Sequence, residues 1–195
     1  MTKKEKLTEI YATSAYSNEA KNRTVFSESS VGSPIYGEVM YEGTNSILKK
    51  FSDHFNKEAV FYDLGSGLGK MVLHIGMESG VKKSIGIEYS KERFNASKNL
   101  KDKYAKDFNN IHFICGNVLE CDLSDASIIY MDNTVFPPHI NEKIYNKLPK
   151  GCLILYKKPF SASFESEGFD YQKQNIEHKL VKRTYNQSAL YWYIK

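Results

Sequence analysis

The chain has 195 residues, a length that suits one globular domain with a buried core. Its residues are 41% apolar and 26% charged, and no apolar run reaches the length of a membrane-spanning helix. A net charge of +4 argues against strong nucleic-acid binding, and residues 1–7 lack the apolar core of a secretory signal, so we expect an intracellular protein, cytoplasmic or nuclear.

The cysteines are spaced unlike those of a metal site or a disulfide framework. Cys115, Cys121 and Cys152 show no C-x-x-C spacing and have no neighbouring histidines. An odd number of cysteines also argues against a set of disulfides. We therefore expect no metal, and thiols that stay reduced inside the cell.

The chain begins with a polar segment and then alternates between apolar runs and amphipathic segments. Residues 1–34 are turn-rich, with only a weak helical pattern near 5–16, and a helix is predicted over 43–57. The alternation that follows predicts a parallel sheet with helices on both faces. The expected strands are 59–64, 83–88, 110–115, 127–132 and 151–156, and the expected helices are 68–79, 90–106 and 138–147.

The C-terminal tail differs from the alternating part. Segments 175–183 and 189–194 predict two strands that pair as an antiparallel hairpin. Together with the five parallel strands they predict a doubly wound, mostly parallel, seven-stranded α/β sheet of the Rossmann-like kind. We expect this domain to cover residues 35–195 and residues 1–34 to form a partly irregular arm.

A glycine-rich turn stands between the first predicted strand of the sheet and the helix that follows it. The apolar run from Val60 carries Asp63 near its end, and Gly65, Gly67 and Gly69 follow. Glycines let the backbone approach a ligand closely, and the first N–H groups of a helix face such a ligand. Glu88 ends the next predicted strand, which is where a ribose-binding carboxylate is expected.

Four interpretations of this turn compete. A phosphate-binding P-loop is excluded, because Leu64 stands five residues before Gly69 and Met71 follows Lys70. A dinucleotide site is weakened, because that pattern requires glycine at position 70. The pattern G-x-G-x-G after an acid is typical of S-adenosylmethionine-dependent methyltransferases, and Asp63 suits a cofactor with a cationic end. An ordinary structural turn between a strand and a helix remains the alternative.

Two later segments place polar residues after predicted strands. Asn117 stands where a side chain contacts the adenine edge, or it forms an Asx turn. Asp132 and Asn133 end the fourth strand, and Phe136 and two prolines follow. An asparagine carbonyl can orient a lysine amine, and an aromatic wall attracts a cation and excludes water. The alternative is that Asp132 and Asn133 only begin a turn before a helix.

Taken together, these segments resemble the disruptor-of-telomeric-silencing family, the histone lysine methyltransferases that lack a SET domain. The resemblance covers about residues 36–193 and rests on the order and spacing of its motifs. The segments that carry it are Tyr36-Gly37-Glu38, 63–70, Gly116-Asn117-Val118, 132–136, 151–160 and Tyr191-Trp192-Tyr193.

The chain also departs from the family's pattern. The family usually has glutamine where Lys70 stands and aspartate where Asn117 stands, so the chemistry of adenine recognition is altered. A long helical N-terminal region and an extended basic tail are missing from this sequence. Methylation of lysine in general is therefore better supported than activity directed to the nucleosome.

The resemblance implies an S-adenosylmethionine-dependent lysine methyltransferase with a protein substrate, for which a histone is one candidate. We expect a monomer with no membrane segment and weak or no nucleic-acid binding. Methylation of a small molecule or nucleic acid, and a non-catalytic cofactor-binding module, remain the alternatives. The expected cofactor-binding residues are Tyr36, Glu38, Asp63, Gly65, Gly67, Gly69, Lys70, Glu88, Asn117 and Val118. The expected amine channel is formed by Asn133, Phe136, Tyr191 and Trp192.

Overall fold

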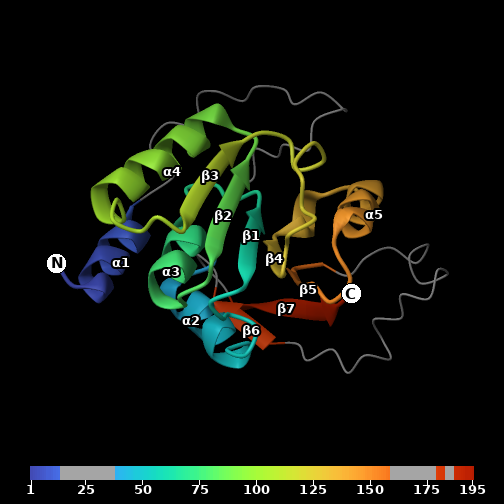
Figure 1. The fold of residues 1–195 in the computed structure, drawn as a ribbon, viewed down its shortest axis with the longest axis horizontal. Coiled ribbons are helices and arrows are strands. Elements are labelled where there is room, and N and C mark those ends of the chain that lie inside the picture. Colours follow the sequence, from blue (N-terminus) through green and yellow to red (C-terminus); the bar gives the residue numbers. More distant parts are fainter. Residues whose placement is uncertain (14–37, 159–178, 183–186) are drawn as a thin grey trace.

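A seven-stranded sheet forms the centre of the molecule. The computed structural model describes residues 1–13, 38–158, 179–182 and 187–195. The strands are β1 (Val60–Leu64), β2 (Lys83–Glu88), β3 (Ile111–Cys115), β4 (Ile128–Met131), β5 (Leu153–Tyr156), β6 (Lys179–Lys182) and β7 (Gln187–Ile194). Their order in the sheet is β3-β2-β1-β4-β5-β7-β6 (Figure 1).

The first five strands are parallel, and β7 runs antiparallel to both β5 and β6. The predicted fold class, a mostly parallel sheet with a C-terminal antiparallel hairpin, is therefore confirmed. The boundaries of β1 to β5 differ from the predicted ones by at most two residues.

Five α-helices and one 3-10 turn belong to the described residues. They are α1 (Lys3–Ala12), α2 (Tyr41–Lys50), α3 (Lys70–Glu78), α4 (Lys91–Tyr104), α5 (Pro138–Lys147) and η1 (Asn133–Val135). The helix predicted over 43–57 is shorter than expected and ends at Lys50. Polar side chains after it bond to nearby backbone instead, since the Asn56 amide donates to the Asp53 carbonyl (3.1 Å). No helix of the described residues is both long and apolar enough to span a bilayer.

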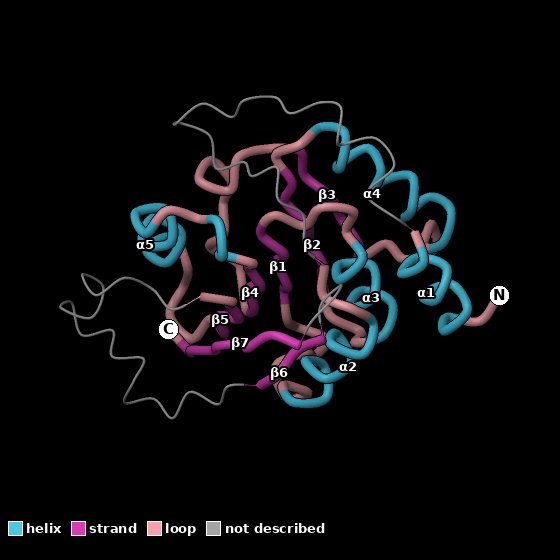
Figure 2. Tube along the Cα trace, turned by 180° about the vertical axis from the view of Figure 1, so that it is seen from behind, coloured by secondary structure: helices cyan, strands magenta, loops and turns pink. Residues whose placement is uncertain are grey.

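Helices cover both faces of the sheet, as the alternating pattern predicts. In β1, Phe61 packs into one apolar cluster, whereas Val60, Tyr62 and Leu64 pack into the other. The first cluster includes residues of α1, α2, α3 and α4, and the second includes residues of α5. Figures 1 and 2 show α1 and α4 beside the β3 end of the sheet and α5 beside β4 and β5.

Helix α1 packs on the core although it lies in the predicted arm. Leu7 and Ile10 are fully buried in the cluster that also contains α3. The helix starts with a capping box, in which the Thr2 hydroxyl and the Glu5 carboxylate each accept the other residue's backbone N–H. The boundary at residue 34 between an arm and a domain stays a prediction.

The strand order creates a switch point beside β1. The chain runs outward from β1 through β2 to β3, and then returns to place β4 on the other side of β1. In open α/β sheets, ligands bind outside the carboxyl ends of the strands at such a point. The ends of β1, β2 and β4 therefore define where a functional site is expected.

A buried polar network joins α1, α2 and α3. His74 is fully buried, and its ring nitrogens lie 3.1 Å from the Tyr11 hydroxyl and 3.2 Å from the Asn45 carbonyl oxygen. The Tyr11 hydroxyl also lies 2.9 Å from the Thr44 hydroxyl, and the Tyr41 ring stacks on the imidazole. Burial lowers the pKa of His74 to about 4, so the imidazole is neutral at physiological pH.

This neutral histidine makes stability depend on pH. The pKa of His74 is about 4 in the folded chain and about 6.5 when unfolded, so the unfolded chain binds more protons between these values. The contribution is complete above pH 6.5 and is lost as the pH falls toward 4.

We expect the free energy of unfolding of the wild type, relative to His74→Gln, to fall by about 2 kcal/mol between pH 7.5 and pH 5. Urea unfolding of both proteins at the two pH values measures it, and other titrating groups cancel in the comparison. If the free energy of unfolding changed with pH by the same amount in both proteins, His74 would not be the group responsible for the pH dependence.

Candidate functional site

The glycine-rich turn between β1 and α3 is held by the neighbouring strand. The N–H groups of Gly65 and Ser66 donate to the Ile87 carbonyl of β2 at 2.9 and 3.0 Å. Gly69 has a φ of +72°, and a side chain there would collide with the Phe113 ring. Gly65 has a φ of +88° and faces open space, so the backbone is accessible to a ligand at this position.

Asp63 is a buried acid at the carboxyl end of β1. Its side chain is only 5% exposed, and among the described residues no donor bonds to its carboxylate. Burial, with additional repulsion from Glu88 and Asp132, raises the pKa of Asp63 to about 8. A buried carboxylate without a partner is unfavourable, and a cationic ligand would remove that penalty.

Glu88 bonds to the glycine-rich turn itself. One carboxylate oxygen accepts from the Gly67 N–H and the other from the Ser90 N–H, each at 2.8 Å. Glu88 thereby joins the turn to the start of α4. Each oxygen keeps a further lone pair, so the predicted ribose contact stays a prediction.

Ser66 adds an unused polar group to the turn. Its hydroxyl oxygen is buried and has no hydrogen-bond partner within the described part of the chain. Sequence reasoning did not select this residue, because serine between glycines has no distinctive pattern.

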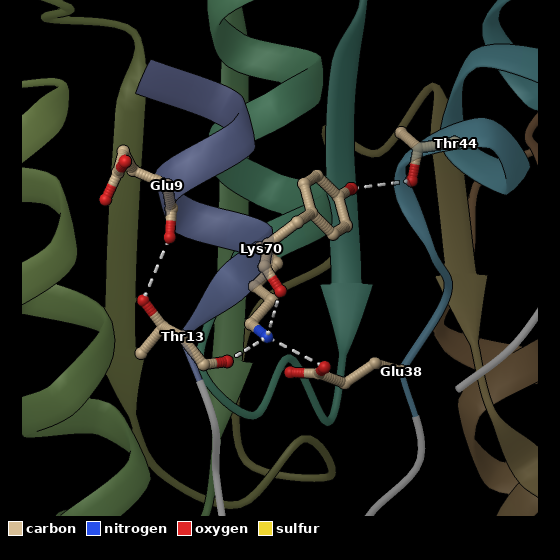
Figure 3. A network of polar contacts seen from close by, with 6 residues as sticks. Glu9, Thr13, Glu38, Thr44 and Lys70 are labelled. Atoms are coloured by element: carbon tan, nitrogen blue, oxygen red, sulfur yellow. Dashed lines mark hydrogen bonds and ion pairs between the residues drawn. The ribbon is translucent and has the colours of Figure 1, made fainter. Parts of the chain in front are cut away.

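Lys70 and Glu38, both predicted to bind the cofactor, form a buried ion pair (Figure 3). The Lys70 ammonium lies 2.8 Å from the Glu38 carboxylate, and the two side chains are 4% and 13% exposed. The ammonium also donates to the carbonyls of Thr13 (2.5 Å) and Tyr11 (3.4 Å), at the end of α1. Three segments therefore meet at the first residue of α3. Tyr36, which is also predicted to bind the cofactor, lies outside the described residues.

Asn117 and Val118 follow β3. The Asn117 carbonyl oxygen accepts from the Leu119 N–H (3.0 Å), which is an Asx turn, and its amide donates to Glu120 at 3.4 Å. Val118 is buried in the apolar cluster under α5. The predicted contact of these residues with adenine is untested.

Asn133 joins the carboxyl ends of β4 and β5. Its side chain is fully buried, and its carbonyl oxygen accepts from the N–H groups of Lys157 (2.9 Å) and Lys158 (2.8 Å). Its amide donates to the Lys158 carbonyl at 2.7 Å. Met131 and Tyr156 are the last paired residues of β4 and β5. The Asn133 side chain therefore satisfies backbone groups that lie just beyond the paired part of the two strands.

The predicted channel aromatics lie on both faces of the sheet. Phe136 and Tyr191 pack against the cluster under α5, and the Tyr191 ring stacks on Tyr156 with centroids 5.7 Å apart. Trp192 packs against the opposite cluster, where its ring meets Phe51 of the segment after α2 edge-on (5.7 Å). Adjacent residues of a strand point to opposite faces, so Tyr191 and Trp192 cannot line the same side.

Comparison with known proteins points to one family. The model of the family described as "Histone methylation protein DOT1" matches residues 11–192. A "Histone-lysine N-methyltransferase, H3 lysine-79 specific" from Drosophila melanogaster is 26% identical over 140 residues, which cover 65% of this chain and 8% of that protein. A "Protein-lysine N-methyltransferase" from Saccharolobus islandicus is 29% identical over 96 residues, which cover 49% of this chain and 56% of that protein.

Solved structures show the same fold. An RNA methyltransferase from Salinibacter ruber, in complex with S-adenosyl-L-homocysteine, aligns with a TM-score of 0.56 and 19% identity. The alignment covers 80% of this chain and 92% of that chain. At this identity the likeness establishes the sheet and its helices, and no substrate.

The buried ion pair allows a test of what holds the site together. Removal of one partner leaves the other charge buried and alone, which typically costs 3–5 kcal/mol. In a double-mutant cycle with Lys70→Met and Glu38→Gln, we therefore expect a coupling energy of about 3 kcal/mol in urea unfolding.

The exposed pair of Lys83 and Asp125 is the matched control, with charges 3.3 Å apart and side chains 43% and 46% exposed. The same cycle with Lys83→Met and Asp125→Asn is expected to give less than about 1 kcal/mol. Equal coupling energies for the two pairs would show that burial does not strengthen the interaction between Lys70 and Glu38.

Proposed function

This chain belongs to the DOT1 family of histone methylation proteins, and from that premise we propose that it transfers a methyl group from S-adenosylmethionine to a lysine of a protein. The observation that carries the proposal is the match of the family model to residues 11–192, nearly the whole chain. The predicted cofactor is confirmed at the level of the family and the fold. A histone or another chromatin protein is the proposed substrate, and the proposed compartment is the nucleus or cytoplasm.

The residues at the switch point fit this cofactor. S-adenosylmethionine carries an α-ammonium group and a positively charged sulfur. Within the described residues, no donor bonds to the buried Asp63 carboxylate, and the buried Ser66 hydroxyl has no hydrogen-bond partner. We propose that Asp63 and the backbone of Gly65 and Gly67 hold the cofactor, and that Glu88 contacts it while it anchors the turn.

The chemistry requires positioning more than proton transfer. When bound, the cofactor supplies a methyl carbon on a cationic sulfur that leaves with the bonding electron pair. The residues of the chain must align an unprotonated amine with that carbon and exclude water. Phe136 and Tyr191, which pack on the same face, are the proposed aromatic wall for the amine. The proton leaves to solvent.

Transfer of radiolabelled methyl groups tests the proposal directly. We expect label in protein when S-adenosylmethionine and the chain are mixed with core histones, nucleosomes, a mixed lysate and RNA in separate reactions. Acid hydrolysis should recover the label as methyl-lysine. Label found only in RNA or in small molecules would overturn the proposal, and no label with any acceptor would favour a non-catalytic module.

Asp63 makes cofactor affinity depend on pH. The raised pKa of about 8 means that the free protein holds a proton on Asp63 at neutral pH. A cationic ligand binds the ionised form, so binding releases this proton and weakens as the pH falls below 8.

We expect the affinity for S-adenosylhomocysteine, measured by calorimetry, to fall roughly fifteenfold from pH 8 to pH 6.5. Adenosine, which lacks the ammonium group, serves as the control ligand, and its affinity should stay constant over this range. A constant affinity for both ligands would remove Asp63 from the cofactor site.

A further inference from the structure

The Lys70 ammonium donates to three acceptors of its own chain. They are the Glu38 carboxylate (2.8 Å), the Thr13 carbonyl and the Tyr11 carbonyl (3.4 Å). An ammonium group has three protons, and these contacts use all of them. The side chain is only 4% exposed. We therefore expect any role of Lys70 in cofactor binding to be indirect.

Helices α1 and α3 run antiparallel and are bonded to each other at three levels. At the far end of α3 the Lys3 ammonium donates to the Met77 carbonyl (2.7 Å), and in the middle the Tyr11 hydroxyl bonds to the His74 ring (3.1 Å). At the start of α3, Lys70 bonds to the two carbonyls at the end of α1. Only this last contact adjoins the glycine-rich turn, so it is the one through which α1 can influence the turn.

The charge of Lys70 suits the end of α1 better than the start of α3. The amino end of a helix carries partial positive charge, whereas the carboxyl end carries partial negative charge and carbonyls without a helical partner. Lys70 is the first residue of α3, but its ammonium reaches the end of α1, whose last turn contains no basic residue. Glu38 adds a negative charge from the segment before α2. Attraction thus holds three segments together (Figure 3).

The glycine-rich turn is held at its two ends by different contacts. The N–H groups of residues 65–67 bond to β2, at the Ile87 carbonyl and the Glu88 carboxylate. The other end of the turn is Gly69, which has no side chain to cap α3 and directly precedes Lys70. The contacts with β2 do not involve α1, whereas those of Lys70 do. The position of α1 therefore bears on the second end of the turn.

We propose that Lys70 is a positioning residue for S-adenosylmethionine, through which the docking of α1 and the binding of the cofactor strengthen each other. This inference rests on the proposed function for the identity of the ligand. With α1 docked, Lys70 holds the end of the turn in the position that accepts the cofactor. Coupling between two equilibria is reciprocal, so the bound cofactor stabilises the docked helix by the same factor.

The charge at position 70 sets this chain apart from the usual pattern of its family, which has glutamine there. A glutamine amide has two donor protons and no charge. It can neither serve three acceptors nor compensate the buried Glu38 carboxylate. Lys70→Gln therefore removes the proposed coupling while it keeps a polar side chain at the start of α3.

Calorimetry with S-adenosylhomocysteine tests the effect on the cofactor. We expect Lys70→Gln to weaken binding about tenfold and to raise KM for S-adenosylmethionine by a similar factor, while kcat falls less than about threefold. Lys3→Gln is the matched control, because it removes a bond between α1 and the far end of α3, and its affinity should stay within about twofold of the wild type. If Lys70→Gln does not fold, the double variant with Glu38→Gln leaves no lone buried charge and should show the same loss.

Hydrogen exchange of backbone amides measures the reverse effect. Saturating S-adenosylhomocysteine should slow exchange in α1, relative to α5, about tenfold in the wild type and less than about twofold in Lys70→Gln. Helix α5 belongs to the other apolar cluster and reports the general stabilisation by the ligand. A residue that only supported the fold would lower stability without changing this difference between the two helices.

The outcomes separate this inference from the proposed function. An affinity of Lys70→Gln within about twofold of the wild type would overturn the inference and leave the proposed function standing. Equal slowing of exchange in α1 of both proteins would also overturn it, because the cofactor would then stabilise the helix without Lys70. If the wild type does not bind S-adenosylhomocysteine even at millimolar concentration, the proposed function and the inference both fail.

Discussion

The site depends on the free-energy cost of burying the Asp63 carboxyl group, to which no donor bonds among the described residues. A buried carboxylate loses its hydration, and Glu88 and Asp132 add repulsion instead of compensation. Because the pKa is raised to about 8, Asp63 is protonated at neutral pH in the folded chain, and the neutral carboxyl group avoids most of this cost. The strand order brings these acids together, because β1 lies between β2 and β4 and the carboxyl ends of the three parallel strands lie at one edge of the sheet. A cationic ligand would compensate the charge of the ionised carboxylate. Ligand binding is therefore expected to stabilise the folded protein.

The polar residues around Asp63 mostly bind the chain itself. Glu88 bonds the glycine-rich turn to the start of α4, and Asn133 bonds the end of β4 to the residues that follow β5. Both side chains satisfy backbone groups at places where the sheet's hydrogen-bond ladder ends. Such residues decide where the ligand-binding groups stand. A side chain near a cofactor can therefore act by contact, by support or by both, and the hydrogen-bond capacity that it has left decides which roles are open to it.

The sequence was sufficient to predict the fold because the apolar runs are strongly periodic and each ends at a turn signal. The same rule located Asp63 and Glu88, since parallel strands bring their carboxyl ends to one edge. It could not predict the partners of side chains that meet across the chain. Lys70 and Glu38 are 32 residues apart, and the helix that shares their contacts belongs to a segment whose helical pattern is weak and which was predicted to be partly irregular. Trp192 was grouped with Tyr191 by resemblance, although strand alternation separates their faces.

Helix α1 shows why those long-range contacts matter for the site. Its last residues supply two carbonyls to Lys70, and Tyr11 bonds to the neutral His74 on α3. The side chains of Leu7 and Ile10 pack the helix against the core. Because apolar contacts are not directional, they hold the helix close to the core but restrict its rotation about its own axis only weakly. Directional polar contacts restrict rotation and sliding, and buried ones tolerate little misalignment because an unsatisfied partner is costly. Lys70 is the first residue of α3, which follows the glycine-rich turn. The contacts that orient α1 therefore also restrict the position of the residue at the end of this turn. The N-terminal helix therefore helps to shape the proposed cofactor site, although none of its side chains needs to contact the cofactor.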